Sequence, residues 1–142
     1  MKKMNYKIIA KYIKNLKFDI PNAKTFFSIG KNISNYRINI DIKSNQIKEK
    51  IIEIETSLNL VSEQKDVTKI NTKIVFATII ELTTQKVGKE ELEKIILIDV
   101  PSNVYSEMRK IFLFLFETSG FKEIKIKEDV NFEELYNKRK NQ

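Results

Sequence analysis

The amino-acid sequence predicts an α+β fold, a four-stranded antiparallel sheet with one long helix and shorter helices packed on one side. Two patterns indicate this fold. Four segments alternate apolar and polar residues with the period of two that is typical of half-buried strands, and they lie at residues 6–12, 36–43, 52–60 and about 69–84. Over residues 104–116, apolar residues recur at helical spacing instead, which predicts a long helix that can cover the sheet.

The N-terminal segment predicts a strand, a turn and a short helix. Lysines interrupt an apolar series that is expected to share one face of the strand, namely Tyr6, Ile8, Ala10 and Tyr12. Pro21 ends this strand, because proline has no backbone N–H for the ladder. Asn22 is expected to cap a helical turn over residues 23–27, and residues 30–35 are expected to form a loop.

The two middle segments predict half-buried strands. Each carries one apolar face, formed by Tyr36, Ile38, Ile40 and Ile42 in the first and by Ile52, Ile54, Leu58 and Leu60 in the second. Glu53 and Glu55 fall on the opposite face, where a solvated surface explains them better than an acid and base pair. Residues 63–66 then supply a polar turn into the fourth strand.

The fourth strand is apolar on both faces in its middle. Phe76 and Ile80 belong to one face, and Val75, Ala77 and Ile79 belong to the other. An antiparallel strand needs two apolar faces only where something covers each of them. Helices are therefore expected on one side, and a partner is a candidate for the other.

Three helices are expected in the second half of the chain. Residues 89–98 form the first, and Pro101 ends the connection that follows it. Ser102 or Asn103 is expected to cap the long helix, which ends near Gly120. Asp129 or Asn131 is expected to cap the last helix, which has acidic residues in its first turn and basic residues in its last, as the helix dipole favours.

The C-terminal half of the long helix is apolar almost all round. Beyond its main stripe it also carries Tyr105, Leu113 and Phe114. A helix that covers one sheet does not need these residues, so burial against a second subunit is the economical explanation. The expected oligomer interface comprises Tyr105, Phe112, Leu113, Phe114 and Phe116.

Composition excludes most catalytic chemistry. The 142 residues, most simply one domain over 1–142, include no cysteine and no histidine. This removes disulfides, the usual zinc ligands, and serine or cysteine nucleophiles that depend on histidine. Because no glycine-rich phosphate loop or metal-ligand spacing occurs either, we expect no enzyme activity, no cofactor and no metal site.

The basic charge and the apolar runs have ordinary explanations. Lysine supplies almost all of the net charge of +7, as A+T-rich coding would favour, and only three arginines are present. No uninterrupted apolar region follows the basic N-terminus, and the longest apolar run, residues 111–116, is far shorter than the roughly 20 residues of a membrane span. We therefore expect a cytoplasmic protein without membrane insertion.

Short motifs at both ends point to a family. Phe18 with Pro21-Asn22-Ala23 marks the N-terminal turn, and Val130-Asn131-Phe132 followed by Leu135-Tyr136 marks the last helix. Between them lie Pro101 with Arg109 eight positions later, and Gly120-Phe121. In order and spacing, residues 6–136 resemble the SecB family of bacterial export chaperones.

The resemblance implies a SecB-like fold, a homotetramer built as a dimer of dimers, and surface grooves that hold unfolded polypeptides. Ile70 and Tyr136 match positions of the family's client groove. Phe26 and Phe27 are further aromatic candidates for the groove, with packing onto the sheet as the favoured alternative. An apolar groove suits such clients, because unfolded chains share exposed apolar side chains rather than a fixed sequence.

The resemblance also implies docking of the SecA motor through an acidic and apolar surface. The matching positions here are Asn15, Asp19, Asn71 and Lys73. Only Asp19 keeps the acidic charge of the family, and Lys73 reverses it. Like charges across an interface weaken association, so this sequence leaves contact with the basic segment of the motor open.

Three functions follow. The first is an ATP-independent chaperone, or holdase, that keeps preproteins competent for export through the Sec pathway. The second is a SecB-like chaperone devoted to another client, such as the antitoxin of a toxin–antitoxin system. The third, a lysine-rich nucleic-acid-binding domain, ranks last because no binding motif or aromatic platform accompanies the charge.

Overall fold

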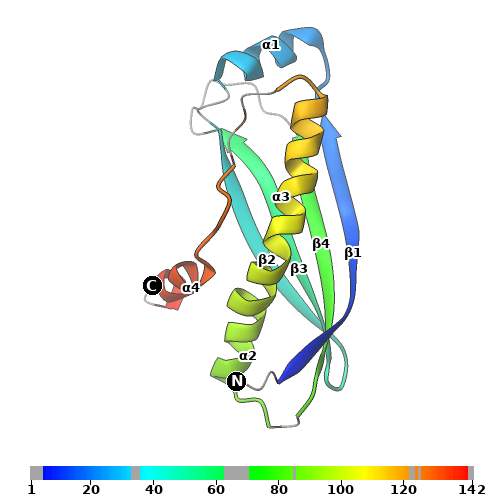
Figure 1. Ribbon diagram of the computed structural model, residues 1–142, viewed down its shortest axis with the longest axis vertical. Helices are drawn as coiled ribbons and strands as arrows, with labels where there is room; N and C mark the ends of the chain where they lie inside the picture. The colour runs from blue at the N-terminus through cyan, green and yellow to red at the C-terminus, as the bar shows by residue number, and fades with distance from the viewer. Residues whose placement is uncertain are drawn as a thin grey trace.

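The computed structural model describes residues 5–32, 36–62, 71–84, 86–121, 124 and 126–140. Strands and helices follow one another along the chain as Figure 1 shows. In order they are β1 (Tyr6–Asp19), α1 (Ala23–Asn32), β2 (Tyr36–Lys48), β3 (Ile51–Ser62), β4 (Asn71–Leu82), α2 (Lys89–Lys94), the π-helix η2 (Ile95–Asp99), α3 (Val100–Thr118) and α4 (Phe132–Lys140).

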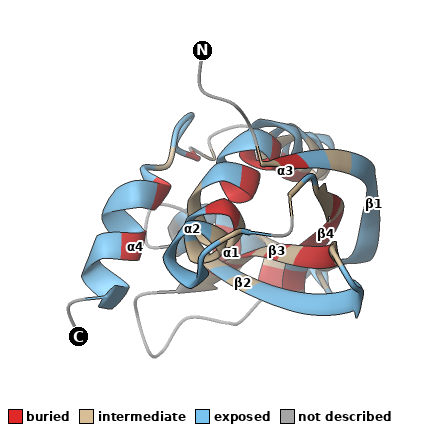
Figure 2. Ribbon diagram, turned by 90° about the horizontal axis from the view of Figure 1, so that it is seen from below, coloured by how far each residue is buried: buried red, intermediate tan, exposed pale blue. Residues whose placement is uncertain are grey.

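The four strands form one antiparallel sheet in the order β1-β4-β3-β2, so β1 and β2 are its edge strands. The continuous unit α2-η2-α3 lies along one face, α1 sits at one end, and α4 lies beside β2 (Figure 1). Buried residues gather between α3 and the sheet (Figure 2). The predicted fold class is confirmed.

Strand β1 is longer and less regular than the sequence predicted. Its pairing with β4 shifts register between Ile8 and Ala10, and again between Ile13 and Asn15. Each bulge adds one residue to β1 and moves the following side chains to the other face. Tyr6 and Ile8 therefore face the helices, whereas Tyr12 lies on the outer face, where its hydroxyl donates to Glu53. The prediction that Tyr12 shares a face with Tyr6 is wrong.

Pro101 does not interrupt the helical unit. The residue before α3, Asp99, has helical angles of φ −64° and ψ −52°, and Pro101 lies at the start of α3. In a regular α-helix, the ring of Pro101 would clash with the carbonyl of Leu97, four residues earlier. Leu97 lies in the π-helix η2, which directly precedes α3. The wider π turn accommodates the ring, so the expected cap at Ser102 or Asn103 is wrong.

Two predicted helix caps are confirmed. The Thr25 N–H donates to the Asn22 side-chain oxygen over 2.8 Å, and the Glu134 N–H donates to the Asn131 side-chain oxygen over 3.0 Å. Helix α1 continues to Asn32, so the expected loop is wrong at residues 30–32, and residues 33–35 lie outside the described residues.

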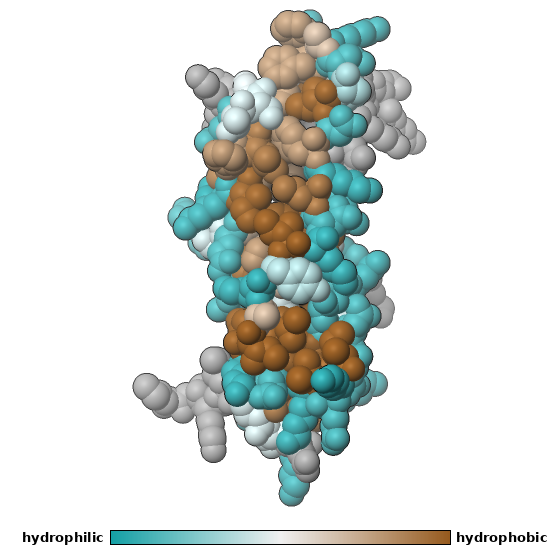
Figure 3. Space-filling model, turned by 90° about the vertical axis from the view of Figure 1, so that its right-hand side faces the viewer, coloured by the Kyte–Doolittle hydropathy of each residue, from teal (hydrophilic) through white to brown (hydrophobic). Residues whose placement is uncertain are grey.

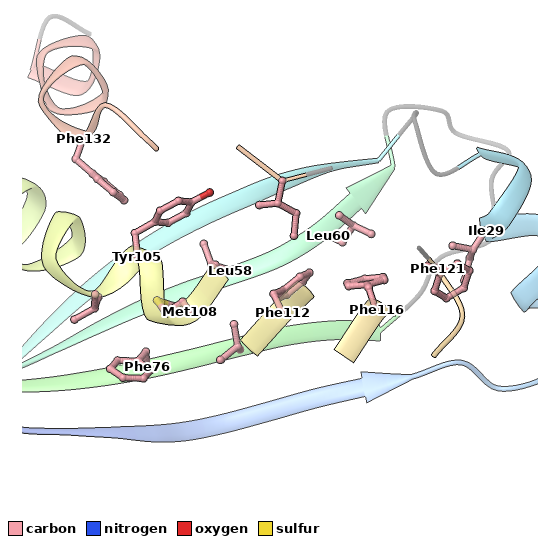
Figure 4. Close-up of a cluster of buried hydrophobic side chains, with 13 residues drawn as sticks. Ile29, Leu58, Leu60, Phe76, Tyr105, Met108, Phe112, Phe116, Phe121 and Phe132 are labelled. Carbon is pink, nitrogen blue, oxygen red and sulfur yellow. The ribbon is translucent and has the colours of Figure 1, made fainter. Parts of the chain in front are cut away.

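The core lies between α3 and the sheet (Figure 4). Met108, Phe112 and Phe116 point from α3 toward Leu58 and Leu60 of β3, and all five are nearly or fully buried. Burial of an aromatic or aliphatic side chain of this size contributes about 1.5–3 kcal/mol each. This cluster therefore fixes α3 on the sheet.

Much of the predicted oligomer interface is the core of the subunit itself. Tyr105, Phe112 and Phe116 are at most 4% exposed, because the sheet covers one side of α3 and the segment leading to α4 covers another. Leu113 is half-buried and Phe114 is 65% exposed. Burial within the subunit leaves these three aromatics almost no surface for a partner, and Phe114 is the most exposed of the five predicted residues.

Helices α1 and α3 meet at a glycine. The Gly120 N–H donates to the Glu117 carbonyl, and the Phe121 N–H donates to the Phe116 carbonyl over 2.9 Å, which is the Schellman motif at the end of α3. Gly120 has φ +102°, and a Cβ built there would lie 3.1 Å from the ring of Phe26. The Phe26 and Phe121 ring centroids are 4.8 Å apart, so α1 docks over the glycine.

The outer sheet face carries a buried polar cluster. Glu53 is 7% exposed and accepts hydrogen bonds from Tyr12 and, over 2.9 Å, from Lys14. Lys14 also lies 3.3 Å from Glu55. Long side chains of β1 thus cross Ala77 of β4, which is fully buried without a covering helix among the described residues. The interpretation of Glu53 as a solvated carboxylate is wrong.

A band of apolar side chains remains exposed along the β1 side (Figure 3). Ile13 and Leu16 of β1 are each 45% exposed, and Phe114 of α3 is exposed further still. Lys11 of β1 and Glu107 of α3 form an ion pair of 2.6 Å that links these two elements. We call Ile13, Leu16 and Phe114 the exposed β1–α3 band.

Candidate functional site

A groove runs between edge strand β2 and helix α4. Its larger part encloses about 740 Å³ and its smaller part about 170 Å³, and both parts share Ile40 and Leu135. We call this hollow the β2–α4 groove. Apolar side chains line the larger part, namely Ile38, Ile40, Tyr105, Ile126, Val130 and Leu135.

Helix α3 fixes the inner wall of the groove. The Tyr105 hydroxyl donates to the Lys127 carbonyl over 2.6 Å, and the Arg109 Nε donates to the Ile126 carbonyl over 3.1 Å. Burial raises the pKa of the Tyr105 phenol, so it stays protonated and able to donate. These two bonds hold residues 126 and 127 against α3, and they give Arg109 of the sequence motif a structural role.

Helix α4 forms the outer wall and is attached at a few points. Phe132 is buried against the Tyr105 ring, with centroids 6.1 Å apart. The Tyr136 hydroxyl donates to Glu93 over 3.2 Å, and Lys140 donates to Glu90 over 3.0 Å. The hydrogen bond from Lys140 lowers the pKa of Glu90, and burial, followed by the bond to Glu93, raises the pKa of Tyr136. Both contacts tie α4 to α2.

The accessible groove surface combines apolar and basic side chains. Ile38 and Ile40 of β2 are half-buried, and Leu135 of α4 is 45% exposed. The charged lining residues of the two parts are Arg37, Lys127, Asp129, Glu134, Lys138 and Arg139. Since β2 is an edge strand, its backbone offers alternating donors and acceptors beside this surface.

The predicted client residues do not all meet at this groove. Tyr136 lines its smaller part, although the side chain is only 5% exposed. Phe26 packs on Phe121 and Phe27 is exposed on α1, and neither lines the groove. Ile70 lies outside the described residues.

The sequence interpretation missed the two walls of the groove. Ile38 and Ile40 were assigned only to a strand face, and Leu135 and Val130 only to a motif. A usable signal was present, because Leu135 directly precedes the tyrosine chosen for the groove. The alternation of apolar and polar residues does not show that β2 is an edge strand.

The predicted motor-docking residues lie together on the outer sheet face. Asp19 pairs with Asn71, Asn15 pairs with Val75, and both Asp19 and Asn15 are exposed on β1. Lys73 is exposed on β4 directly opposite Lys17 of β1. At these positions one carboxylate, that of Asp19, accompanies the adjacent ammonium groups of Lys17 and Lys73.

The described residues offer neither a metal site nor a membrane span. They include no group of three or more aspartate, glutamate, cysteine or histidine side chains that could hold a metal ion. Among them, no helix is both long and apolar enough to span a bilayer.

Comparison with known proteins decides the family. The family model of SecB, the preprotein translocase subunit, matches residues 1–142. The chain belongs to the SecB family. A relative from Pelagibacter ubique that carries the name of the protein-export protein SecB is 37% identical over 137 residues, which cover 96% of this chain and 98% of the relative. The protein-export protein SecB of Rhodospirillum rubrum is 24% identical, and the match covers 93% of this chain and 80% of that protein.

The fold has a solved counterpart. A SecB-like chaperone of Mycobacterium tuberculosis, solved in complex with a peptide from the HigA1 antitoxin, superposes with a TM-score of 0.66. The match covers 89% of this chain and 88% of that chain, at 13% sequence identity. At this identity the likeness shows the fold. Membership of a family of export chaperones and the SecB-like fold, both expected from the sequence motifs, are confirmed.

Proposed function

We propose that this SecB-family chain is an ATP-independent holdase that binds non-native polypeptides in the β2–α4 groove and keeps preproteins competent for export. The observation that supports this most is the groove itself: an apolar hollow of about 740 Å³ beside an edge strand. Its apolar lining and the adjacent strand edge offer surface for binding an extended chain. The proposal is therefore a binding protein and not an enzyme.

The groove suits many sequences. Ile38, Ile40 and Leu135 offer apolar contacts without a deep, shaped pocket, and the β2 edge is adjacent to them. An extended polypeptide can place alternate side chains on such a surface. Each contact is weak, and affinity for a long client grows with the number of contacts made together.

A second candidate function is a chaperone for a dedicated client such as an antitoxin. The observation that favours it is the structural counterpart, which was solved with an antitoxin peptide. The same groove would serve either client class, so the two candidates differ in the client and not in the site.

Assembly and motor docking form part of the proposal. We propose a homotetramer, with the exposed β1–α3 band, Ile13, Leu16 and Phe114, covered by other subunits, because apolar side chains this exposed are costly to leave in water. SecA would dock on the outer sheet face around Asp19 and Asn15, and the Lys17–Lys73 pair would weaken a basic partner there.

The test is suppression of aggregation of a reduced, unfolded protein. The variants Leu135→Asp and Ile40→Asp place a carboxylate in the groove and should each weaken holding severalfold. Ile47→Asp is the matched control, because Ile47 is a 53% exposed isoleucine of the same strand that does not line the groove. If all three variants suppress aggregation equally well, the groove is not the client-binding site. If the wild-type protein does not suppress aggregation, the proposed holdase function is wrong.

A further inference from the structure

Of the three arginines of this lysine-rich chain, two line the β2–α4 groove and the third supports its inner wall. Arg37 on β2 lines its larger part, and Arg139 on α4 lines its smaller part. Arg109 holds the inner wall through the Ile126 carbonyl. Arginine and lysine together number 26, so lysine is the ordinary cation of this chain, and two of its three arginines line the groove.

Arginine binds carboxylates in a way that lysine cannot. Its planar guanidinium presents five N–H donors and binds a carboxylate through two parallel hydrogen bonds, which a lysine ammonium cannot do. Arg109 donates one of these N–H groups to the Ile126 carbonyl. Arg37 and Arg139 are exposed on the two walls, where a bound polypeptide would meet them.

The charges around the groove add up to a basic rim. Arg37, Lys127, Lys138 and Arg139 face two carboxylates, Asp129 and Glu134. Glu134 is 3.9 Å from Lys138, one turn along the same helix. Among the described lining residues, cations thus outnumber carboxylates by four to two. An excess of positive charge over an apolar surface attracts acidic segments and repels basic ones.

The two exposed arginines mark the ends of the groove along β2. Arg37 lines the larger part, whereas Arg139 shares the smaller part with Ile42. From Arg37 to Ile42 the strand advances five residues at about 3.3 Å each, or roughly 16 Å. An extended client lying along β2 would span the same distance with about five residues, and apolar side chains of the groove lie between the two ends.

We infer that the β2–α4 groove selects extended client segments in which an apolar core is flanked by acidic residues, and that Arg37 and Arg139 bind the flanking carboxylates. This rests on the proposed holdase function and specifies the client chemistry of that site. The apolar core supplies contact area, and the two arginines supply the preference among apolar segments.

Three labelled peptides test the inference. Each carries the same five-residue apolar core, flanked on both sides by glutamate, by glutamine or by lysine, and binding is followed by fluorescence anisotropy at low and at physiological salt. The glutamate-flanked peptide should bind about three- to tenfold more tightly than the glutamine-flanked one at low salt, as expected for two partly solvated ion pairs, and the difference should shrink with salt. The lysine-flanked peptide should bind most weakly.

Arg37→Gln and Arg139→Gln locate the effect. Each variant should lower the ratio of the affinity for the glutamate-flanked peptide to the affinity for the glutamine-flanked peptide. Lys110→Gln, an exposed cation of α3 that does not line the groove, is the matched control and should keep the full preference.

The outcomes separate the inference from the proposed function. If the glutamine-flanked peptide binds and the glutamate-flanked one binds no more tightly, the inference is overturned and the holdase function stands. If Lys110→Gln loses as much preference as the arginine variants, net charge is responsible and the inference is also overturned. If none of the peptides binds, both fail.

Discussion

Lys14 on edge strand β1 lies 2.9 Å from the carboxylate of Glu53 on β3, across the whole width of β4. The crossing passes over Ala77, whose small side chain leaves room for it and is fully buried beneath it. Tyr12 donates to the same carboxylate from β1. One buried carboxylate therefore joins β1 to β3 across β4, on the sheet face that the described helices leave uncovered.

The first prediction concerns acid stability. The hydrogen bond from Tyr12, followed by that from Lys14, lowers the pKa of Glu53 below its usual 4.5. A carboxyl with a lowered folded-state pKa contributes stability at neutral pH, and that contribution is lost as the pH falls through the folded-state pKa. Glu53→Gln should therefore lower the melting temperature at neutral pH. Below pH 4.5, the melting temperature of this variant should fall less steeply with decreasing pH than that of the wild type.

The measurement is thermal unfolding followed by circular dichroism over this pH range. Glu117→Gln serves as the control, because Glu117 is an exposed carboxylate of α3 away from the cluster. An acid decline in Glu53→Gln as steep as in the wild type would show that Glu53 does not govern it.

The second prediction concerns the junction of α1 and α3. Gly120→Ala forces a side chain onto φ +102° and places its Cβ 3.1 Å from the ring of Phe26. Backbone strain of this kind costs about 1–3 kcal/mol, so the free energy of unfolding should fall by that amount. Gly30→Ala is the matched control: Gly30 lies within α1 with nothing within 4 Å of an added Cβ, and the change should be neutral or stabilising by up to about 1 kcal/mol. Urea unfolding of both variants measures the difference, and similar values would contradict the role of Gly120.

These local features show which parts of the fold the sequence could predict. Strands β2, β3 and β4 and the caps Asn22 and Asn131 follow from period and residue type, which are local properties. The bulges of β1 could not be predicted, because they are set by its register against β4. The continuous helix through Pro101 was missed because a π turn, which has no strong sequence signal, accommodates the proline ring.

The site was predicted less well than the fold. Tyr136 lies at the groove, but Ile38 and Ile40 were missed because the groove depends on which strand ends the sheet. Tyr105 and Phe112 were assigned to an interface because helical periodicity does not reveal how many elements of the same chain surround a helix. The order of strands in the sheet and the path of the segment before α4 depend on tertiary structure, and the alternation of apolar and polar residues does not predict them.

The third prediction concerns assembly. Phe114 is 65% exposed within the exposed β1–α3 band, so Phe114→Asp should leave the subunit folded and disrupt packing between subunits. Light scattering should give a lower solution mass than for the wild type, with an unchanged circular dichroism spectrum. Ile47→Asp, an exposed isoleucine on the other edge strand, should keep the wild-type mass. A wild-type mass for Phe114→Asp would mean that this band is not an interface.

The last prediction links a helix cap to client binding. Asn131 accepts the Glu134 N–H over 3.0 Å and so closes the first turn of α4, the outer wall of the groove. Asn131→Ala should destabilise α4 locally by about 0.5–2 kcal/mol, because a backbone donor loses its partner. Asn131→Asp should preserve the cap, because aspartate accepts the same bond and its charge suits the helix N-terminus.

Hydrogen exchange followed by mass spectrometry measures this effect. Amides of α4 should exchange faster in Asn131→Ala than in the wild type or in Asn131→Asp, while those of β3 and β4 should not change. The Ala variant should also bind unfolded client more weakly, because an ordered α4 carries Leu135 into the groove. Faster exchange with unchanged client binding would show that α4 need not be ordered for holding, and would leave β2 and the inner wall as the binding surface.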